Sequence, residues 1–220
     1  MPRPSHPRGA ATRAVLAAIG ASCVVLLSGC VTGERATLEP VAQVDDAVAA
    51  VVLQRLDLAD SVAFTATYDI FPSTTGEPTV AVVRQLDGRQ RVTIGTVDYL
   101  IDAGTTQTCN SDTGECLDYI DDAQISDLNV THQFWSDGAA ARLLTDASRR
   151  VGFSVGHAET IADRPAACAD VPVLGGTVVY CALDAGVLAR FFNADVTIEL
   201  TSFSNDVDDD SFSTDFDPSL

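Results

Sequence analysis

Ser154, which lies between two glycines in Gly152-Phe153-Ser154-Val155-Gly156, has the spacing of a catalytic nucleophile. The pattern G-x-S-x-G is typical of serine hydrolases, in which a strand leads into the serine and a helix follows it. Here a helical pattern precedes the motif, a strand-like segment follows it, and the only later histidine is the nearly adjacent His157. We therefore predict a glycine-bounded loop and no enzymatic activity.

The first 29 residues have the layout of a secretory signal. They hold three arginines and no acidic residue, and their apolar run from Ala14 to Leu27 is short for a membrane span. The run ends in Leu27-Ser28-Gly29-Cys30, which resembles the lipobox of bacterial lipoproteins. The resemblance implies cleavage before Cys30, a lipid on its thiol and a location on the outer face of the bacterial cell membrane. An ordinary secreted protein is the alternative.

Four cysteines remain after Cys23 leaves with the signal and Cys30 receives lipid. They are Cys109, Cys116, Cys168 and Cys181. An even number in an exported chain indicates two disulfides, and local pairing, first with second and third with fourth, is the economical choice because each pair encloses a turn-like segment. Zinc is the alternative, but the gap after Cys109 is wider than usual ligand spacing. We predict no metal and no cofactor.

Acidic residues dominate the exported part of the chain. It keeps 10 of the 13 basic residues and all 31 acidic ones, a formal charge of −21, which disfavours nucleic acid and anionic lipid headgroups as partners. The arginine-only basic residues, with abundant alanine, valine and aspartate, resemble the composition of a high-GC actinobacterial genome. Residues 205–220 are predicted to form an acidic, disordered tail.

Three tail residues, Asp206, Asp208 and Asp210, fall at positions 1, 3 and 5 of an EF-type calcium loop. Ser211 stands where the loop needs glycine, and Asp217 stands where it needs glutamate. We therefore expect non-specific attraction of cations by the tail and no dedicated site.

Strands are the main elements expected to position these residues. Alternating patterns predict strands at 62–70, 79–86, 90–95, 97–101, 157–162, 166–171, 177–183 and 195–203. Helical spacing predicts a helix over 44–59 and another after Trp135, with Ala140, Leu144, Ala147 and Val151 on one face and an Arg142–Asp146 pair on another. His132, Phe134 and Trp135 are expected to pack the entrance of that helix; the alternative is that they line a ligand pocket.

These elements predict an α+β fold with a curved, mostly antiparallel, half-barrel-like sheet covered by two or three helices. We expect a signal peptide (1–29), a lipidated tether (30–43), a single domain (44–204) and the tail (205–220).

The order of elements and the lipobox resemble the half-open barrel lipoproteins of the LolA and mycobacterial LppX/LprG type. The most specific stretch is Tyr180-Cys181-Ala182-Leu183-Asp184, followed by Gly186-Val187-Leu188-Ala189-Arg190 and the strand from 195, about 25 residues in all. It resembles the strand, aspartate, Gly-Leu-x-x-Arg turn and long strand near the end of those proteins. The two local disulfides and the acidic tail depart from the family pattern.

The resemblance implies a pocket for acyl chains between sheet and helices. Its candidate lining residues lie on apolar faces of strands: Phe64, Tyr68, Val82, Ile94, Ile198 and Leu200. The chain would then be a membrane-anchored carrier or sensor of a lipid or other hydrophobic ligand. In the alternative, the same residues fill an ordinary core, and the chain is a non-enzymatic protein-interaction module of the cell envelope whose partner is unknown.

Overall fold

The computed structural model describes residues 46–74 and 76–213. They belong to one compact unit, Gln43–Leu220. The expected signal peptide, Cys30, the tether and residues 214–220 lie outside the described residues. Within the described part, no helix is both long and apolar enough to cross a membrane.

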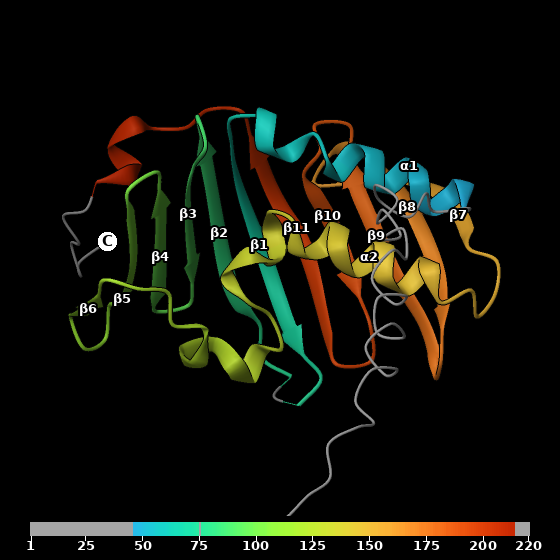
Figure 1. Cartoon of the computed structure of the whole chain (residues 1–220), viewed down its shortest axis with the longest axis horizontal. Helices are drawn as coiled ribbons and strands as arrows, with labels where there is room; N and C mark the ends of the chain where they lie inside the picture. Colours follow the sequence, from blue (N-terminus) through green and yellow to red (C-terminus); the bar gives the residue numbers. More distant parts are fainter. Residues whose placement is uncertain (1–45, 75, 214–220) are drawn as a thin grey trace, which may run out of the picture. The chain divides into compact units, whose positions relative to one another are not determined.

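A single sheet of 11 antiparallel strands forms the framework of this unit (Figure 1). The strands are β1 (Phe64–Pro72), β2 (Thr79–Leu86), β3 (Arg89–Ile94), β4 (Val97–Asp102), β5 (Thr105–Asn110), β6 (Glu115–Leu117), β7 (Val155–Ile161), β8 (Arg164–Val173), β9 (Gly176–Leu183), β10 (Leu188–Phe192) and β11 (Val196–Ser204). Their order is β6-β5-β4-β3-β2-β1-β11-β10-β9-β8-β7. Every pairing joins strands that are consecutive in the chain except that of β1 with β11, and β6 and β7 form the two edges of the sheet.

Helices cover one face of the sheet. They are α1 (Ala47–Leu56), α2 (Gly138–Ser148) and the short 3₁₀ helices η1 (Ala59–Ser61), η2 (Asp122–Leu128) and η3 (His132–Trp135). A fourth 3₁₀ helix, η4 (Asp209–Phe212), contacts Arg89 and Arg91, whose side chains belong to the opposite face of β3. Figure 1 shows α1 and α2 across the half that ends in β7, and the segment with η2 and η3 across the other half. We call the covered side the inner face and the opposite side the outer face. The predicted α+β class, with a curved open antiparallel sheet, is confirmed.

Alternation along each strand decides which side chains reach the inner face. In β1, Phe64, Ala66, Tyr68 and Ile70 are buried, and the residues between them are half-exposed. The Tyr68 ring lies 5.7 Å from that of Trp135, and Phe134 lies 5.0 Å from Phe191, so η3 packs directly on the sheet. The prediction that Phe134 and Trp135 pack the entrance of the second helix is confirmed.

The buried face of α2 differs from the predicted one by one residue. Ala139, Leu143 and Ala147 are buried, and so is Asp146, whose Oδ2 accepts a hydrogen bond of 2.7 Å from the Tyr180 hydroxyl. The sequence suggested Arg142 as the partner of Asp146 because the two have i, i+4 spacing. The predicted pairing was wrong because a helix carboxylate is normally expected to be exposed. The Asp146 carboxylate is instead buried, where it accepts the hydrogen bond of a buried tyrosine hydroxyl.

Two other segments also correct the sequence predictions. Leu188–Phe192 forms strand β10, although the sequence suggested no strand between 184 and 194. Residues 205–213 are not disordered: Phe212 is buried, the Arg89 guanidinium lies 4.8 Å above its ring, and Arg91 donates to the Ser211 carbonyl. Phe212 and the two arginine contacts together hold this segment against β3.

Candidate functional site

The six residues expected to line an acyl pocket do not all share one face. Val82 lies on the outer face, because it pairs with Thr67 of β1 while its neighbours Ala81 and Val83 pair with Tyr68 and Ala66. The other five lie on the inner face: Phe64, Tyr68, Ile94, Ile198 and Leu200. A side chain that lines a space large enough for water keeps accessible surface, and each of these five keeps 2% or less. They therefore belong to a filled core.

A polar cleft opens at one end of the inner face, with a volume of about 460 Å³. The ends of β2, β3 and β4 form one wall, and η3 with the start of α2 forms the other. The lining residues are Gln85, Gly88, Arg89, Gln90, Ile101, His132, Gln133, Ser136 and Asp137. This volume lies in the range of small-molecule and peptide side-chain sites.

Two glutamines on paired strands form the floor of the cleft. Gln85 and Gln90 face each other across the β2–β3 hairpin, and Gln90 also pairs with Ile101 of β4. Gln85 donates a 2.6 Å hydrogen bond from Nε2 to the Ala59 carbonyl. Gln90 is only 8% exposed, yet its amide has no hydrogen-bond partner within 46–74 and 76–213. Within the described residues, the buried side-chain atoms without a partner are Trp135 Nε1 and Asp170 Oδ1. The Gln90 amide is therefore open to water in the cleft, where a ligand can hydrogen-bond to it.

His132 supplies a fixed imidazole to the same cleft. Its Nδ1 lies 2.9 Å from Oδ2 of Asp122, and its ring stacks on Tyr99 at 5.5 Å. A carboxylate at one ring nitrogen sets the tautomer and leaves the other nitrogen, Nε2, for a ligand. Burial, with the charges of Asp122 and Asp121, raises the pKa of Tyr99 far above its usual range, so this tyrosine stays neutral beneath the imidazole.

Charged side chains frame the mouth of the cleft. Arg89 is held by Asp209 at 2.6 Å, and Asp137 is exposed on the opposite wall. The cleft thus combines amide, imidazole, hydroxyl and charged groups, which suits a polar occupant. Sequence reasoning missed it because its two walls, which end at Ile101 and begin at His132, are 31 positions apart along the chain. The available signal was a glutamine on each side of the Asp87-Gly88 turn, in positions that alternate with apolar residues.

Ser154 has a structural role. Its motif is a loop between α2 and β7, and its hydroxyl donates to Oδ2 of Asp46, the N-cap residue of α1. The strand follows the serine, so the arrangement is the reverse of a nucleophile elbow. The hydrogen bond joins the loop to the beginning of α1.

Replacing Ser154 by alanine should lower stability in a pH-dependent way. Burial raises the pKa of Asp46. Hydrogen bonds from Ser154, Ala49 and Val48 lower it by more than burial raises it, so the net shift of the pKa is downward. A lowered pKa stabilises the fold at a pH above the unfolded value and loses this contribution as the pH falls. We expect the variant to lose about 1 kcal/mol at pH 6. Urea denaturation from pH 6 to 3 should show the difference shrinking, and a constant difference would contradict this role.

Both predicted disulfides are present and local. Cys109 bonds to Cys116, joining β5 to β6, and Cys168 bonds to Cys181, joining β8 to β9. The oxidised sulfurs exclude the zinc alternative for these four residues. His157 and Glu159 approach Cys168 on the outer face, but its sulfur is already bonded and Glu159 pairs with Arg190. Disulfides indicate an oxidising, extracytoplasmic compartment.

The tail aspartates cap their own segment. Asp208 accepts a hydrogen bond from the Asp210 backbone amide, and Asp206 accepts one from the Ser204 hydroxyl. Asp208 is the N-cap residue of η4, so its carboxylate satisfies a free backbone amide at the start of that helix.

Fold and cleft together define an extracytoplasmic α+β domain with an open antiparallel sheet, a filled inner face and a polar cleft at one end. No protein-family model and no curated protein matches the chain. Among solved structures, it is similar to crystal structures of MucB. One match has 16% identity and a TM-score of 0.49, covering 77% of this chain and 64% of MucB.

Two further matches are MucB in complex with MucA(peri) and the Pseudomonas aeruginosa MucA/MucB complex. They have 17% and 18% identity and TM-scores of 0.46 and 0.47, and each covers 76% of this chain. The chain spans about 60% of the length of those structures. The likeness concerns the arrangement of the chain alone.

Proposed function

We propose that this protein is a lipid-anchored, non-enzymatic interaction module of the cell envelope, which binds a polar segment of a partner protein in the cleft. The observation that carries the proposal is the floor of the open polar cleft, where the Gln90 amide has no hydrogen-bond partner in the described residues and is free to bind a ligand. A peptide segment offers the donors and acceptors that Gln90 and His132 require.

The filled inner face favours this function over lipid carriage. An acyl chain needs a continuous apolar cavity, and the five inner-face residues expected to line one are packed against the covering segments. The Tyr68 hydroxyl even donates across this region to the Leu188 carbonyl at 3.0 Å. Opening a cavity there would require separating η3 and β10 from β1.

Membrane attachment belongs to the same proposal. The lipobox ending at Cys30 supports it, and the two disulfides support export. A lipid on Cys30 would hold the cleft at the outer surface of the cell membrane, where a partner in the envelope can reach it.

Site-specific photo-crosslinking in the native cells tests the cleft. A photoreactive residue at Gln133, on the exposed wall of the cleft, should give a discrete protein adduct. The same residue at Thr201, exposed on the outer face, is the matched control and should give none. The Gln133 adduct should fall at least about fivefold when Gln90 is also changed to alanine, since a buried hydrogen bond contributes about 1 kcal/mol or more.

Two outcomes would overturn the proposal. Equal crosslinking at Gln133 and Thr201 would show that the cleft is not the contact. Native mass spectrometry of the mature chain with Cys30→Ser would favour the carrier function if a stoichiometric lipid remained bound.

A further inference from the structure

Large apolar side chains are exposed together at the end of the domain that carries β7. Phe153, in the loop between α2 and β7, is 96% exposed, and Leu174, in the β8–β9 turn, is 89% exposed. The two segments are neighbours, because a Cβ on Gly152 would lie 3.1 Å from the Pro172 side chain. Val151 and Val155 flank Phe153 and are also exposed. We call Val151, Phe153, Val155 and Leu174 the end patch.

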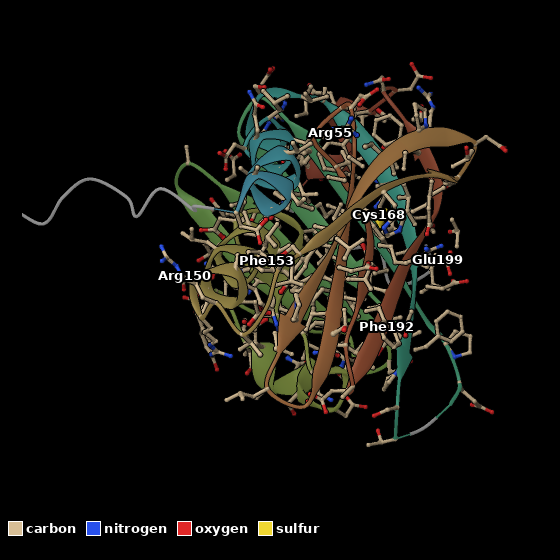
Figure 2. All side chains as sticks on the ribbon, turned by 90° about the vertical axis from the view of Figure 1, so that its right-hand side faces the viewer. Arg55, Arg150, Phe153, Cys168, Phe192 and Glu199 are labelled. Atoms are coloured by element: carbon tan, nitrogen blue, oxygen red, sulfur yellow. A yellow bond between two sulfur atoms is a disulfide. The ribbon has the colours of Figure 1, made fainter. Side chains whose placement is uncertain are left out.

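Such exposure is costly in water. Fully exposed phenylalanine and leucine side chains at loop tips contribute nothing to the core, and burying each in an apolar environment is favourable. Exposed apolar groups that gather in one place mark a contact surface. Figure 2, which looks onto this end, shows Phe153 and Arg150 on the side that carries the helices, and Cys168, Phe192 and Glu199 on the outer side.

The end patch lies where the chain from the lipidation site enters the domain. Ser154, next to Phe153, is hydrogen-bonded to Asp46, the first described residue. Only 15 residues lie between Cys30 and Asp46, and such a chain spans at most about 55 Å. A lipid on Cys30 would therefore hold Asp46 within about 55 Å of the bilayer.

Positive charge accompanies the patch. Arg149 and Arg150 directly precede Val151, and the Arg149 side chain is 59% exposed, with one 3.5 Å contact to Asp146. The exported part has a net charge of −21, which disfavours an anionic surface as a general partner. Two consecutive arginines stand beside the apolar loop tips, together with the carboxylates of Asp46 and Asp170. Apolar insertion flanked by arginine is the pattern of interfacial membrane binding.

We infer that the end patch docks onto the membrane surface, with Phe153 and Leu174 inserted among the lipid headgroups and Arg149 near their phosphates. The inference extends the proposed lipid anchor by adding a second, non-covalent contact. Docking also fixes the orientation of the domain relative to the membrane.

Vesicle co-sedimentation of the mature chain with Cys30→Ser tests the inference without the lipid. Wild-type protein should bind vesicles of mixed phosphatidylglycerol and phosphatidylcholine. The double variant Phe153→Ser/Leu174→Ser should bind at least about tenfold more weakly, since it removes two inserting side chains. Arg149→Gln should weaken binding about fivefold on these vesicles and leave binding to pure phosphatidylcholine unchanged.

The matched control is Val80→Ser/Phe192→Ser, which removes two apolar outer-face side chains that are 49% and 44% exposed. It should bind like the wild type. A Phe153→Trp variant should show a blue shift of its emission on vesicles if the side chain leaves water. Three results would overturn the inference. The two double variants could lose vesicle binding equally, or the wild type could fail to bind vesicles at all. The third is that the wild type self-associates in solution and that Phe153→Ser/Leu174→Ser abolishes this self-association.

These outcomes are independent of the proposed function. Palmitate labelling of Cys30 tests the anchor, and crosslinking from Gln133 tests the cleft. Either can succeed or fail whatever the unlipidated protein does on vesicles.

Discussion

Replacing Gly186 by alanine should lower the free energy of unfolding by about 3 to 5 kcal/mol, from a left-handed backbone and a steric clash acting together. Gly186 lies in the β9–β10 turn with a φ of +88°, and an added Cβ would lie 2.7 Å from the Ala59 nitrogen and 2.8 Å from the Arg55 carbonyl oxygen. Both are backbone atoms, which cannot rotate away. The clash would push α1 off the sheet, where Arg55 also bonds to the Ala182 carbonyl and to Asp184.

Gly175→Ala is the matched control. Gly175 has a similar φ of +97° in the β8–β9 turn, but nothing lies within 4 Å of the added Cβ. This variant should lose only about 1 to 2 kcal/mol, from backbone strain. Urea denaturation of both proteins separates the two causes. Equal losses of unfolding free energy in the two variants would mean that the contact between α1 and the β9–β10 turn does not contribute to stability.

Asp98→Ala should cost about 3 kcal/mol, because it leaves a half-buried cation without its partner. Asp98 is 8% exposed and accepts hydrogen bonds from Nε of Arg91, at 2.9 and 3.0 Å, and from the Thr93 hydroxyl. Arg84 lies beside this pair: burial and the charge of Arg91 lower its pKa, whereas Asp98 raises it. Without Asp98, two arginines would repel each other on the outer face.

Asp209→Ala removes an ion pair of similar length at an exposed site and is the comparison for Asp98→Ala. Asp209 binds Arg89 at 2.6 Å, but its side chain is 75% exposed. Solvent screens such pairs, so we expect a loss below about 1 kcal/mol. Thermal or urea unfolding gives both values, and a larger effect at Asp209 than at Asp98 would refute the assignment of the buried pair.

Local patterns predicted much of the sheet. β2 occupies the predicted residues 79–86, and the Asp87-Gly88 hairpin forms with both residues at positive φ, the geometry of a type I′ turn. The two disulfides were predictable because each joins residues on adjacent strands of a hairpin. Alternation and turn chemistry are properties of neighbouring residues, so the sequence alone carries them.

Features that depend on distant segments were not predicted. Val82 was assigned to the inner face because apolar alternation does not say which of two apolar stripes in β2 meets the helices. The buried face of α2 was predicted one residue away from the observed one, because the apolar residues on both sides of that position are consistent with either face. The cleft requires Gln90 and His132 to lie on facing walls, and the burial of Phe212 depends on its contact with Arg89. Only the tertiary structure brings these residues together.

The pairing of β1 with β11 is the one place where the two halves of the sheet meet, since every other pairing joins strands that are consecutive in the chain. The hairpins of each half close short loops, which form on the microsecond scale. Joining Ile70 to Ile198 closes a loop of more than 120 residues, and such non-local contacts slow folding. We therefore expect the two meanders to collapse early and the formation of this seam to set the folding rate of the exported chain.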